Sequence, residues 1–350
     1  MTPSRRTFLT LAAVAVPTAT GLLALPGTAQ GAPGTLPDYL PIPPSSLGPA
    51  LNSDGYFVGQ IRGNLYWVTD SFYQAMFLTT RDGIVLVDAP PTIGRNLLRA
   101  IADITKITGT PSKVTHLVYS HYHADHIGAA TIFGDDVERV AHRETTRLLR
   151  GLADPNRPLP TVTFDDHHTL RVGGEVLQLD YHGPNHTPDN IFIFAPNQET
   201  LMVVDFLFPG WVPFKDLGIS QDIPAWVRMH DVALSYPWRT LVGGHLGRLG
   251  TRSDAMLQRD YVTDLRTQSE AAIKGLDPTP YFAKYGPTGN AWAIFKGYLD
   301  GATQQITDVV VAKYAGKLAA VDVFTFDNAF KILESLRTDN GHLGPFNIHQ

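Results

Sequence analysis

The sequence contains no cysteine, and this absence excludes several kinds of site. Thiolate zinc fingers, iron–sulfur clusters, cysteine nucleophiles and disulfide frameworks all need cysteine, so a metal site must use imidazole and oxygen donors. Positive charge is also scarce, because 28 Lys and Arg face 33 Asp and Glu for a formal net charge of −5, with no run of Lys or Arg. The chain therefore lacks the basic footprint of a nucleic-acid-binding protein.

The sequence also has no Gly-rich phosphate loop and no dinucleotide fingerprint, so we expect no organic cofactor. It does have 350 residues, 43% of them hydrophobic, and thirteen histidines. This length and composition suit a globular enzyme with a sizeable core. We also expect its substrate to be a small molecule. Histidine is the residue type most informative about its chemistry.

Residues 1–32 have the layout of a removable export signal. Arg5 and Arg6 precede an apolar stretch that reaches about Leu25, and small residues follow at 27–32. Pro17 and Gly21 interrupt the stretch, which makes a bilayer-spanning helix a poor fit, although a membrane anchor behind a chance Arg-Arg pair is the alternative. The start resembles twin-arginine signals, so we expect export to the periplasm or the exterior and no stable membrane span after signal removal. A chain without thiols suits that destination.

The remainder of the chain divides by pattern into three parts. Residues 33–54 are Pro-rich and predict an extended lead-in without packed structure. Residues 55–250 alternate β patterns with helical ones, which predicts two packed sheets with helices outside. Residues 251–350 predict a helical extension, with helices from an N-cap at Ser253 to Gly275, over 290–315 and over 327–337. The extension could pack over the sandwich, form part of the substrate mouth or make a dimer contact, so a homo-oligomer stays open.

A histidine cluster follows the apolar strand expected at 114–120. It reads His121-Tyr122-His123-Ala124-Asp125-His126. Side chains alternate along an extended chain, so His121 and His123 should point the same way, and Asp125 and His126 should follow where the chain turns into a short helix. An open catalytic zinc site takes three protein ligands, so four candidates in six residues predict two metal ions side by side.

Further candidate ligands stand where other strands end. His186 lies in a turn-rich loop before an apolar strand, Asp205 ends the apolar run 201–204, and His245 follows Gly243 and Gly244, which allow close backbone approach. Polar side chains on the ends of core strands are typical of sites built on a rigid scaffold.

The His-x-His-x-Asp-His motif, the later His-Thr-Pro-Asp-Asn, the Asp after an apolar strand and the Gly-Gly-His resemble the metallo-β-lactamase fold hydrolases over roughly residues 55–250. The resemblance implies an α+β fold, a four-layer αββα sandwich with two Zn²⁺ ions at one edge of its sheets. His121, His123 and His186 would hold the first ion, and Asp125, His126 and His245 the second. Asp205 would bridge both ions. Asp88 matches a carboxylate that in this family supports the metal shell.

Three other residues are assigned to the surroundings of the metals. His182, in the same loop as His186, is expected to reach the second shell or the substrate, and Phe208 and Trp211 are expected in the pocket. The remaining histidines are given ordinary polar or surface roles.

A zinc pair predicts hydrolysis. A bridging hydroxide would attack a substrate carbonyl whose oxygen one zinc polarises, and Asp125 would pass a proton to the leaving group. The ligand types leave iron and manganese open, and with them a mono-iron dioxygenase on the same fold. A non-catalytic binding protein is disfavoured, since all seven ligand candidates are present.

Two sequence differences from the lactamases that carry a cysteine ligand indicate which substrate to expect. Asp205 stands in place of that cysteine, which resembles the glyoxalase II, lactonase and phosphodiesterase branches, and the net negative charge disfavours the last of these. Phe208 stands where many lactamases carry a lysine for the antibiotic carboxylate. Export disfavours an intracellular glutathione thioester. An ester or lactone is therefore the expected substrate, and a β-lactam, with Lys215 replacing the missing lysine, is the alternative.

Overall fold

A computed structural model describes residues 37–346. The predicted export signal at residues 1–32 lies outside the described residues. Every strand and helix of the described residues belongs to one compact unit that begins at Tyr39. Among the described residues, none of the helices is both long enough and apolar enough to cross a bilayer.

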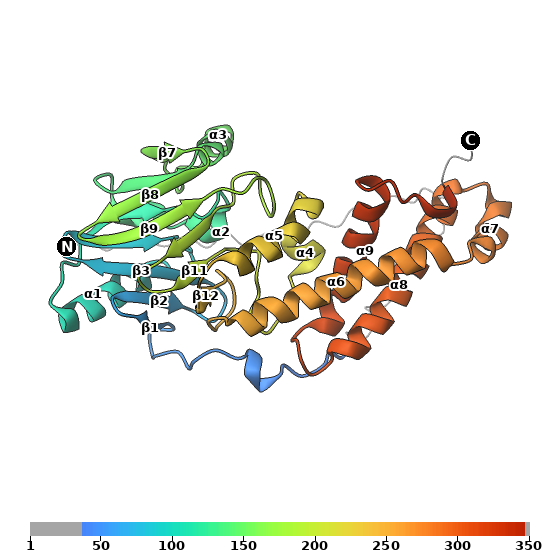
Figure 1. Ribbon diagram of the computed structural model, residues 1–350, viewed down its shortest axis with the longest axis horizontal. Helices are drawn as coiled ribbons and strands as arrows, with labels where there is room; N and C mark the ends of the chain where they lie inside the picture. The colour runs from blue at the N-terminus through green and yellow to red at the C-terminus, as the bar shows by residue number, and fades with distance from the viewer. Residues whose placement is uncertain (1–36, 347–350) are drawn as a thin grey trace, which may run out of the picture. The chain divides into compact units, whose positions relative to one another are not determined.

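The strands of the described residues form two sheets (Figure 1). The first sheet has the order β1 to β7, antiparallel from β1 to β4 and parallel from β4 to β7. The second has the order β12-β11-β10-β9-β8, with β11 and β12 parallel. The bounds of the first sheet are β1 Phe57–Arg62, β2 Leu65–Thr69, β3 Gln74–Thr80, β4 Gly83–Val87, β5 Val114–Val118, β6 Glu138–His142 and β7 Val162–Phe164. Those of the second are β8 His167–Val172, β9 Glu175–Asp180, β10 Phe192–Ala195, β11 Thr200–Met202 and β12 Thr240–Val242.

The strands carry apolar side chains on both faces. Each sheet can therefore pack against the other sheet on one face and against helices on the other. On β2, Leu65 and Trp67 join a core between the sheets, whereas Tyr66 and Val68 join a second core beneath α1 (Asn96–Thr108). A third core lies on the outer face of the second sheet, under α5 (Ile223–Ser235) and the C-terminal helices. Three cores separate four layers, so the predicted αββα sandwich is confirmed.

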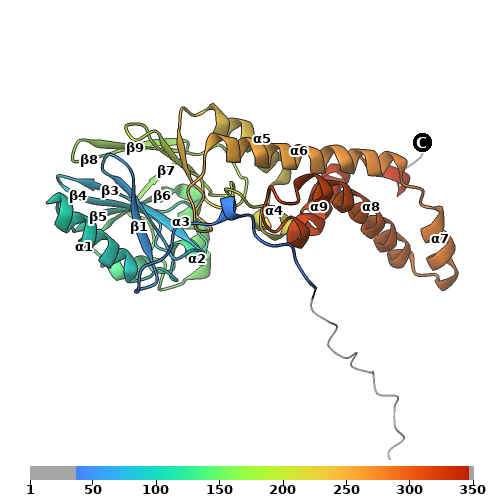
Figure 2. The ribbon, with the colours of Figure 1, turned by 90° about the horizontal axis from the view of Figure 1, so that it is seen from below.

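A helical region follows the sandwich, with α6 against both α8 and α9 (Figures 1 and 2). Its helices are α6 Arg252–Gly275, α7 Thr279–Tyr285, α8 Ala291–Tyr314 and α9 Val321–Thr338. The N-cap of α6 is Thr251, not Ser253, because Thr251 and Asp254 form a reciprocal capping box. Helix α7 was not predicted, since it buries no side chain and so has no apolar period.

The prediction of an unpacked lead-in is wrong for part of its length. A 3₁₀ turn forms at Pro44–Ser46, and Ser46 is buried. The Ser46 hydroxyl donates to the Gly210 carbonyl at 2.7 Å, and the Trp211 indole donates back to the Ser46 carbonyl at 3.1 Å. Gly48 packs against the backbone of Gly247. The lead-in therefore supports the two loops that contain Gly210 and Gly247.

We predict that Gly48→Ala destabilises the protein, because a Cβ at Gly48 would overlap the carbonyl of Gly247 and displace the backbone. The free energy of unfolding should fall by about 1–3 kcal/mol, measured by thermal and chemical unfolding. The control is Gly151→Ala in α3 (Arg143–Leu152), where a Cβ would meet no atom within 4 Å. Equal melting temperatures for both variants would contradict this packing.

Candidate metal centre

The ends of paired strands bring the predicted ligands together. Strands β11 and β12 run parallel with Met202 opposite Val242, so Asp205 and His245, each three residues further on, emerge side by side. In the other sheet β4 and β5 are parallel, with Val87 opposite Val118. Asp88 and the histidine motif therefore leave that sheet at one edge, because parallel strands end on the same side.

The motif reaches the centre through a bend rather than through strand alternation. Strand β5 ends at Val118, so the expected extension to residue 120 and the alternating geometry are wrong. His121 and His123 still face a common point, with ring centroids 4.6 Å apart. Asp125 and His126 lie in the single turn of α2 (Ala124–Ile127).

The structure brings all seven predicted ligands into two adjoining groups. One consists of His121, His123, His186 and Asp205, and the other of Asp125, His126, Asp205 and His245. Within each group the candidate ligand atoms all lie within 4.8 Å of one another. Asp205 belongs to both groups, which is the geometry needed for a bridging carboxylate.

Asp205 is surrounded by imidazoles. Its Oδ2 lies 3.1 Å from His186 Nε2, 3.2 Å from His126 Nε2 and 3.5 Å from His121 Nε2. Its Oδ1 lies 2.8 Å from His245 Nε2. The backbone at Asp205 is left-handed, with φ 58°, a conformation that costs a non-glycine residue about 1–3 kcal/mol.

Buried polar side chains fix the loops that carry these ligands. Asn185 Oδ1 accepts from the His186 amide at 2.7 Å and from Asn190 Nδ2 at 3.0 Å, and Asn190 Nδ2 also donates to the Val204 carbonyl next to Asp205. The His186 loop and the Asp205 strand end are thus tied together.

The predicted supporting carboxylate lies behind the motif. Asp88 is fully buried, and its Oδ1 accepts from the Ser120 amide at 2.8 Å. Its Oδ2 lies 4.0 Å from His126 Nδ1. Burial is the main reason that the pKa of Asp88 rises to about 6, against the lowering effects of His126 and Ser120. Asp88 is therefore placed to orient the His126 ring from its far side.

The ligands differ in charge for physical reasons. Burial lowers the pKa of His123 to about 4 and that of His121 well below its ordinary value, and neighbouring histidines lower both further. Burial alone would lower the pKa of His126, but Asp205, Asp125 and Asp88 outweigh it and raise the pKa to about 9. Burial would raise the pKa of Asp205, yet the surrounding histidines hold it well below its usual range. Neutral imidazoles on His121 and His123 beside the ionised Asp205 carboxylate are the protonation states that metal ligation requires, and His126 would have to release its proton when a cation binds.

The residues present fit a pair of divalent cations. His121 Nε2 is buried and has no hydrogen-bond partner among the described residues, although it faces Asp205. His186 Nε2 lies 3.2 Å from His123 Nδ1, and His126 Nε2 lies 3.1 Å from His245 Nε2. Nitrogen atoms that face one another this closely need a proton or a cation to share. An all-nitrogen-and-oxygen donor set suits zinc, and it suits iron and manganese as well.

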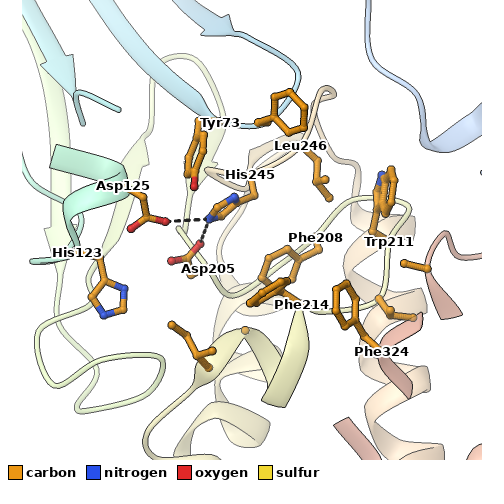
Figure 3. A pocket seen from close by; sticks show the side chains of 15 residues that line it. Tyr73, His123, Asp125, Asp205, Phe208, Trp211, Phe214, His245, Leu246 and Phe324 are labelled. Carbon is orange, nitrogen blue, oxygen red and sulfur yellow. Dashed lines mark ion pairs between the residues drawn. The ribbon is translucent and has the colours of Figure 1, made fainter. Parts of the chain in front are cut away.

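A cavity of about 330 Å³ opens next to these ligands. Figure 3 shows His123, Asp125, Asp205 and His245 on one side of it and Phe208, Trp211, Phe214 and Phe324 on another. Apart from histidines, no basic residue lines the cavity in the described part of the chain. It is an apolar pocket with its polar groups gathered at one wall.

Of the three other residues predicted to surround the metals, two line the cavity and one does not. Phe208 and Trp211 line the cavity as expected. His182 does not line it; its Nε2 lies 2.7 Å from Tyr236 Oη, and its ring packs on Phe192, because the loop turns away before His186. Lys215, the alternative partner for a lactam carboxylate, is not in the lining and lies 3.6 Å from Asp327.

Some lining residues were missed in the sequence. Tyr73 precedes β3, and its ring packs on His245 with centroids 4.6 Å apart. Ala320 and Phe324 lie at the start of α9, so the helical extension forms part of the pocket wall. No local pattern marks these residues, because only the fold brings α9 to a site built between residues 73 and 245.

A left-handed turn forms another part of the wall. Within α4 (Lys215–Ile219), Asp216, Leu217 and Gly218 have φ/ψ of 55/41°, 59/46° and 70/36°, and Ile219 has φ 52°. These values are those of a left-handed helix, which costs L-residues about 1–2 kcal/mol each. The surrounding structure must hold this segment in place.

Comparison with known proteins identifies the family. The model of the Metallo-beta-lactamase superfamily matches residues 68–260. The chain is 25% identical over 217 residues to the 2,4-dinitroanisole O-demethylase subunit alpha of Nocardioides sp. (strain JS1661), covering 61% of this chain and 62% of that protein. It is 27% identical over 176 residues to a metallo-beta-lactamase type 2 of Elizabethkingia meningoseptica, covering 49% of this chain and 68% of that one. The chain thus spans less than two thirds of the O-demethylase subunit.

Among solved structures, a metallo-beta-lactamase from Pontibacter korlensis is similar, with 24% identity and a TM-score of 0.49 over 59% of this chain and 97% of that chain.

We predict that each of the two ligand groups binds one metal ion. After dialysis against Zn²⁺, the protein should hold about two ions per chain, His186→Ala and His245→Ala about one each, and Asp205→Ala should weaken both sites. The control is His182→Ala, in the same loop as His186 but outside the pocket, which should keep both ions. Elemental analysis measures this; His186→Ala and His182→Ala behaving alike would refute the ligand assignment.

Proposed function

The chain belongs to the metallo-beta-lactamase superfamily, and from this premise we propose that it is an exported dinuclear zinc hydrolase that cleaves a carboxylic ester or a lactone. The observation that carries the proposal is the joining of two His/Asp ligand groups to an apolar pocket without Lys or Arg among its described lining residues. The family supports hydrolysis, and the pocket supports a neutral substrate.

The ligand assignment follows the two groups. His121, His123 and His186 would hold one zinc, Asp125, His126 and His245 the other, and Asp205 both. Bound zinc would supply Lewis acidity towards a substrate oxygen and would lower the pKa of water towards neutrality. The protein's own task is to hold the substrate carbonyl at this wall of the pocket and to exclude bulk water with the aromatic walls.

Asp125 is the residue best placed to move a proton. Its side chain is 42% exposed, faces the pocket and lies 3.6 and 3.7 Å from His126 Nε2 and His245 Nε2. An accessible carboxylate next to the substrate can take a proton during attack and return it to the leaving alkoxide.

The pocket favours an ester or lactone over a β-lactam antibiotic. The carboxylate of such an antibiotic is commonly bound by a charge-assisted hydrogen bond from a cation. Here Phe208 occupies the wall, and Lys215 is paired with Asp327 away from the lining. The relatives named metallo-beta-lactamase type 2 keep β-lactam hydrolysis as the alternative.

A second alternative comes from the relative named O-demethylase subunit alpha. Phe208, Trp211, Phe214 and Phe324 form aromatic walls that suit an aryl group, so cleavage of an activated aryl ether such as 2,4-dinitroanisole enters the substrate panel.

We predict that the zinc-loaded protein hydrolyses p-nitrophenyl esters or lactones with kcat/KM at least about tenfold above that on nitrocefin. Asp125→Ala should lower kcat by about 100-fold or more, because it removes the proton-transfer group. The control is Asp135→Ala, an exposed carboxylate in a loop, which should keep full activity.

Three outcomes would overturn the proposal. They are fastest turnover on nitrocefin, turnover of 2,4-dinitroanisole alone, and purification with iron together with oxygen consumption, which would identify a dioxygenase instead.

We predict that export depends on the twin arginines. Replacing Arg5 and Arg6 by lysine keeps the charge but removes the guanidinium pair that twin-arginine signals present, so the precursor should accumulate inside the cell. Cell fractionation of a bacterial host measures this, with Lys106→Arg as the control. Unchanged export of the double variant would contradict a twin-arginine route.

A further inference from the structure

The left-handed turn at residues 215–219 shapes the pocket mouth. Phe214, Gly218 and Ile219 line the cavity, and Phe214 and Ile219 are each 51% exposed there. Gly218 lies against the site itself, since a Cβ at this position would stand 3.1 Å from the Phe208 ring and 3.3 Å from the Asp205 carbonyl. A shift of this turn would therefore change the pocket directly.

A buried amide from the helical extension holds the turn, next to the partly exposed Lys215–Asp327 ion pair. Asn328 on α9 is 0% exposed, and its Oδ1 accepts from the Leu217 amide at 2.7 Å. Its Nδ2 donates to the Pro213 carbonyl at 2.9 Å and to Tyr261 Oη at 3.3 Å. One side chain thus pairs with the backbone on both sides of Phe214, in a place where water cannot substitute for it.

Further hydrogen bonds connect this turn to the loop that carries the candidate ligand His186. Leu217 is buried, and its carbonyl accepts from the Ser220 hydroxyl at 2.6 Å. The next backbone amides, Gln221 and Asp222, donate to the Asn185 carbonyl at 3.3 and 3.0 Å, and Gln221 also donates to the His186 carbonyl at 3.1 Å. The turn is therefore fixed between α9 and the His186 loop.

A second amide from the extension holds the neighbouring part of the wall in the same way. Gln258 on α6 is 1% exposed; its Oε1 accepts from the Phe208 amide at 2.8 Å and its Nε2 donates to the Phe206 carbonyl at 2.7 Å. The extension thus fixes the backbone of two successive wall segments and adds Phe324, whose ring packs on Phe214 with centroids 5.0 Å apart.

We propose that Asn328 is a positioning residue: by fixing the left-handed turn it sets Phe214 and Ile219 against Phe324, and so selects substrates with an apolar acyl or aryl substituent. This inference depends on the proposed function only for the reaction that the bound substrate undergoes. The hydrogen bonds of Asn328 reach the pocket wall and not the two ligand groups. Their loss should therefore weaken the binding of large apolar substrates more than it lowers kcat.

Asn328→Ala tests this, because it removes the hydrogen bond to Leu217 in the turn and the one to Pro213 just before it. The Kd of the neutral fluorescent probe N-phenyl-1-naphthylamine should rise about tenfold, and so should the KM of p-nitrophenyl hexanoate. The kcat on p-nitrophenyl acetate should stay within about twofold, since uniform binding is lost rather than transition-state stabilisation.

The matched control is Ser335→Ala on the same helix. Ser335 donates to Asp339 at 2.7 Å and makes no hydrogen bond to the turn, so this variant should bind the probe and the ester as the wild type does. Asn328→Asp keeps the acceptor for the Leu217 amide and should show a smaller rise in Kd. It also keeps the test available if the alanine variant does not fold.

The proposal is overturned if both Asn328 variants bind the probe as Ser335→Ala does, or if they lose kcat equally on both esters with an unchanged probe Kd. A wild type that binds the probe and hydrolyses neither the two esters nor a lactone would reject the proposed function, while the probe titration would still decide the role of Asn328.

Discussion

The structure depends on one buried carboxylate that five imidazoles and a second carboxylate surround. Asp205 has Nε2 atoms of His121, His126, His186 and His245 within 2.8–3.5 Å. Burying this many nitrogen and oxygen atoms away from water costs free energy unless a positive charge lies among them. Against the effect of burial, the carboxylates of Asp205, Asp125 and Asp88 raise the pKa of His126 to about 9, which favours a protonated, positively charged imidazole. Cations shared between the two ligand groups would replace this proton and satisfy the remaining nitrogens.

The fold divides the work between two regions. The sandwich fixes the ligands, since they follow strand ends whose partners hold them in register and loops that buried amides such as Asn185 and Asn190 tie together. The helical extension fixes the opposite wall through Gln258 and Asn328, and supplies Phe324 to it. On the proposed function, the metal chemistry would reside in the sandwich, and the helical extension would help to set substrate selection, which would allow one to change while the other stays.

Much of this could be predicted from the sequence, because the information is local. Apolar periods marked the central strands and α1, and the short motif at His121–His126 with three later strand-end residues marked the ligand set. Where prediction failed, the cause was tertiary. Strand β5 stops at Val118, and the motif converges through a bend. His182 turns towards Tyr236, Ser46 is buried against Gly210, and α9 delivers Phe324 to a distant site; none of these contacts leaves a trace in nearby residues.

On the proposed function, Asp205 would lie between two metal ions held by separate ligand groups. Anomalous diffraction from crystals of the zinc-loaded protein, collected on both sides of the zinc absorption edge, tests it most directly. We expect two peaks a few ångströms apart, one among His121, His123 and His186 and the other among Asp125, His126 and His245, with the Asp205 carboxylate between them. A single peak, or zinc bound outside these groups, would contradict it.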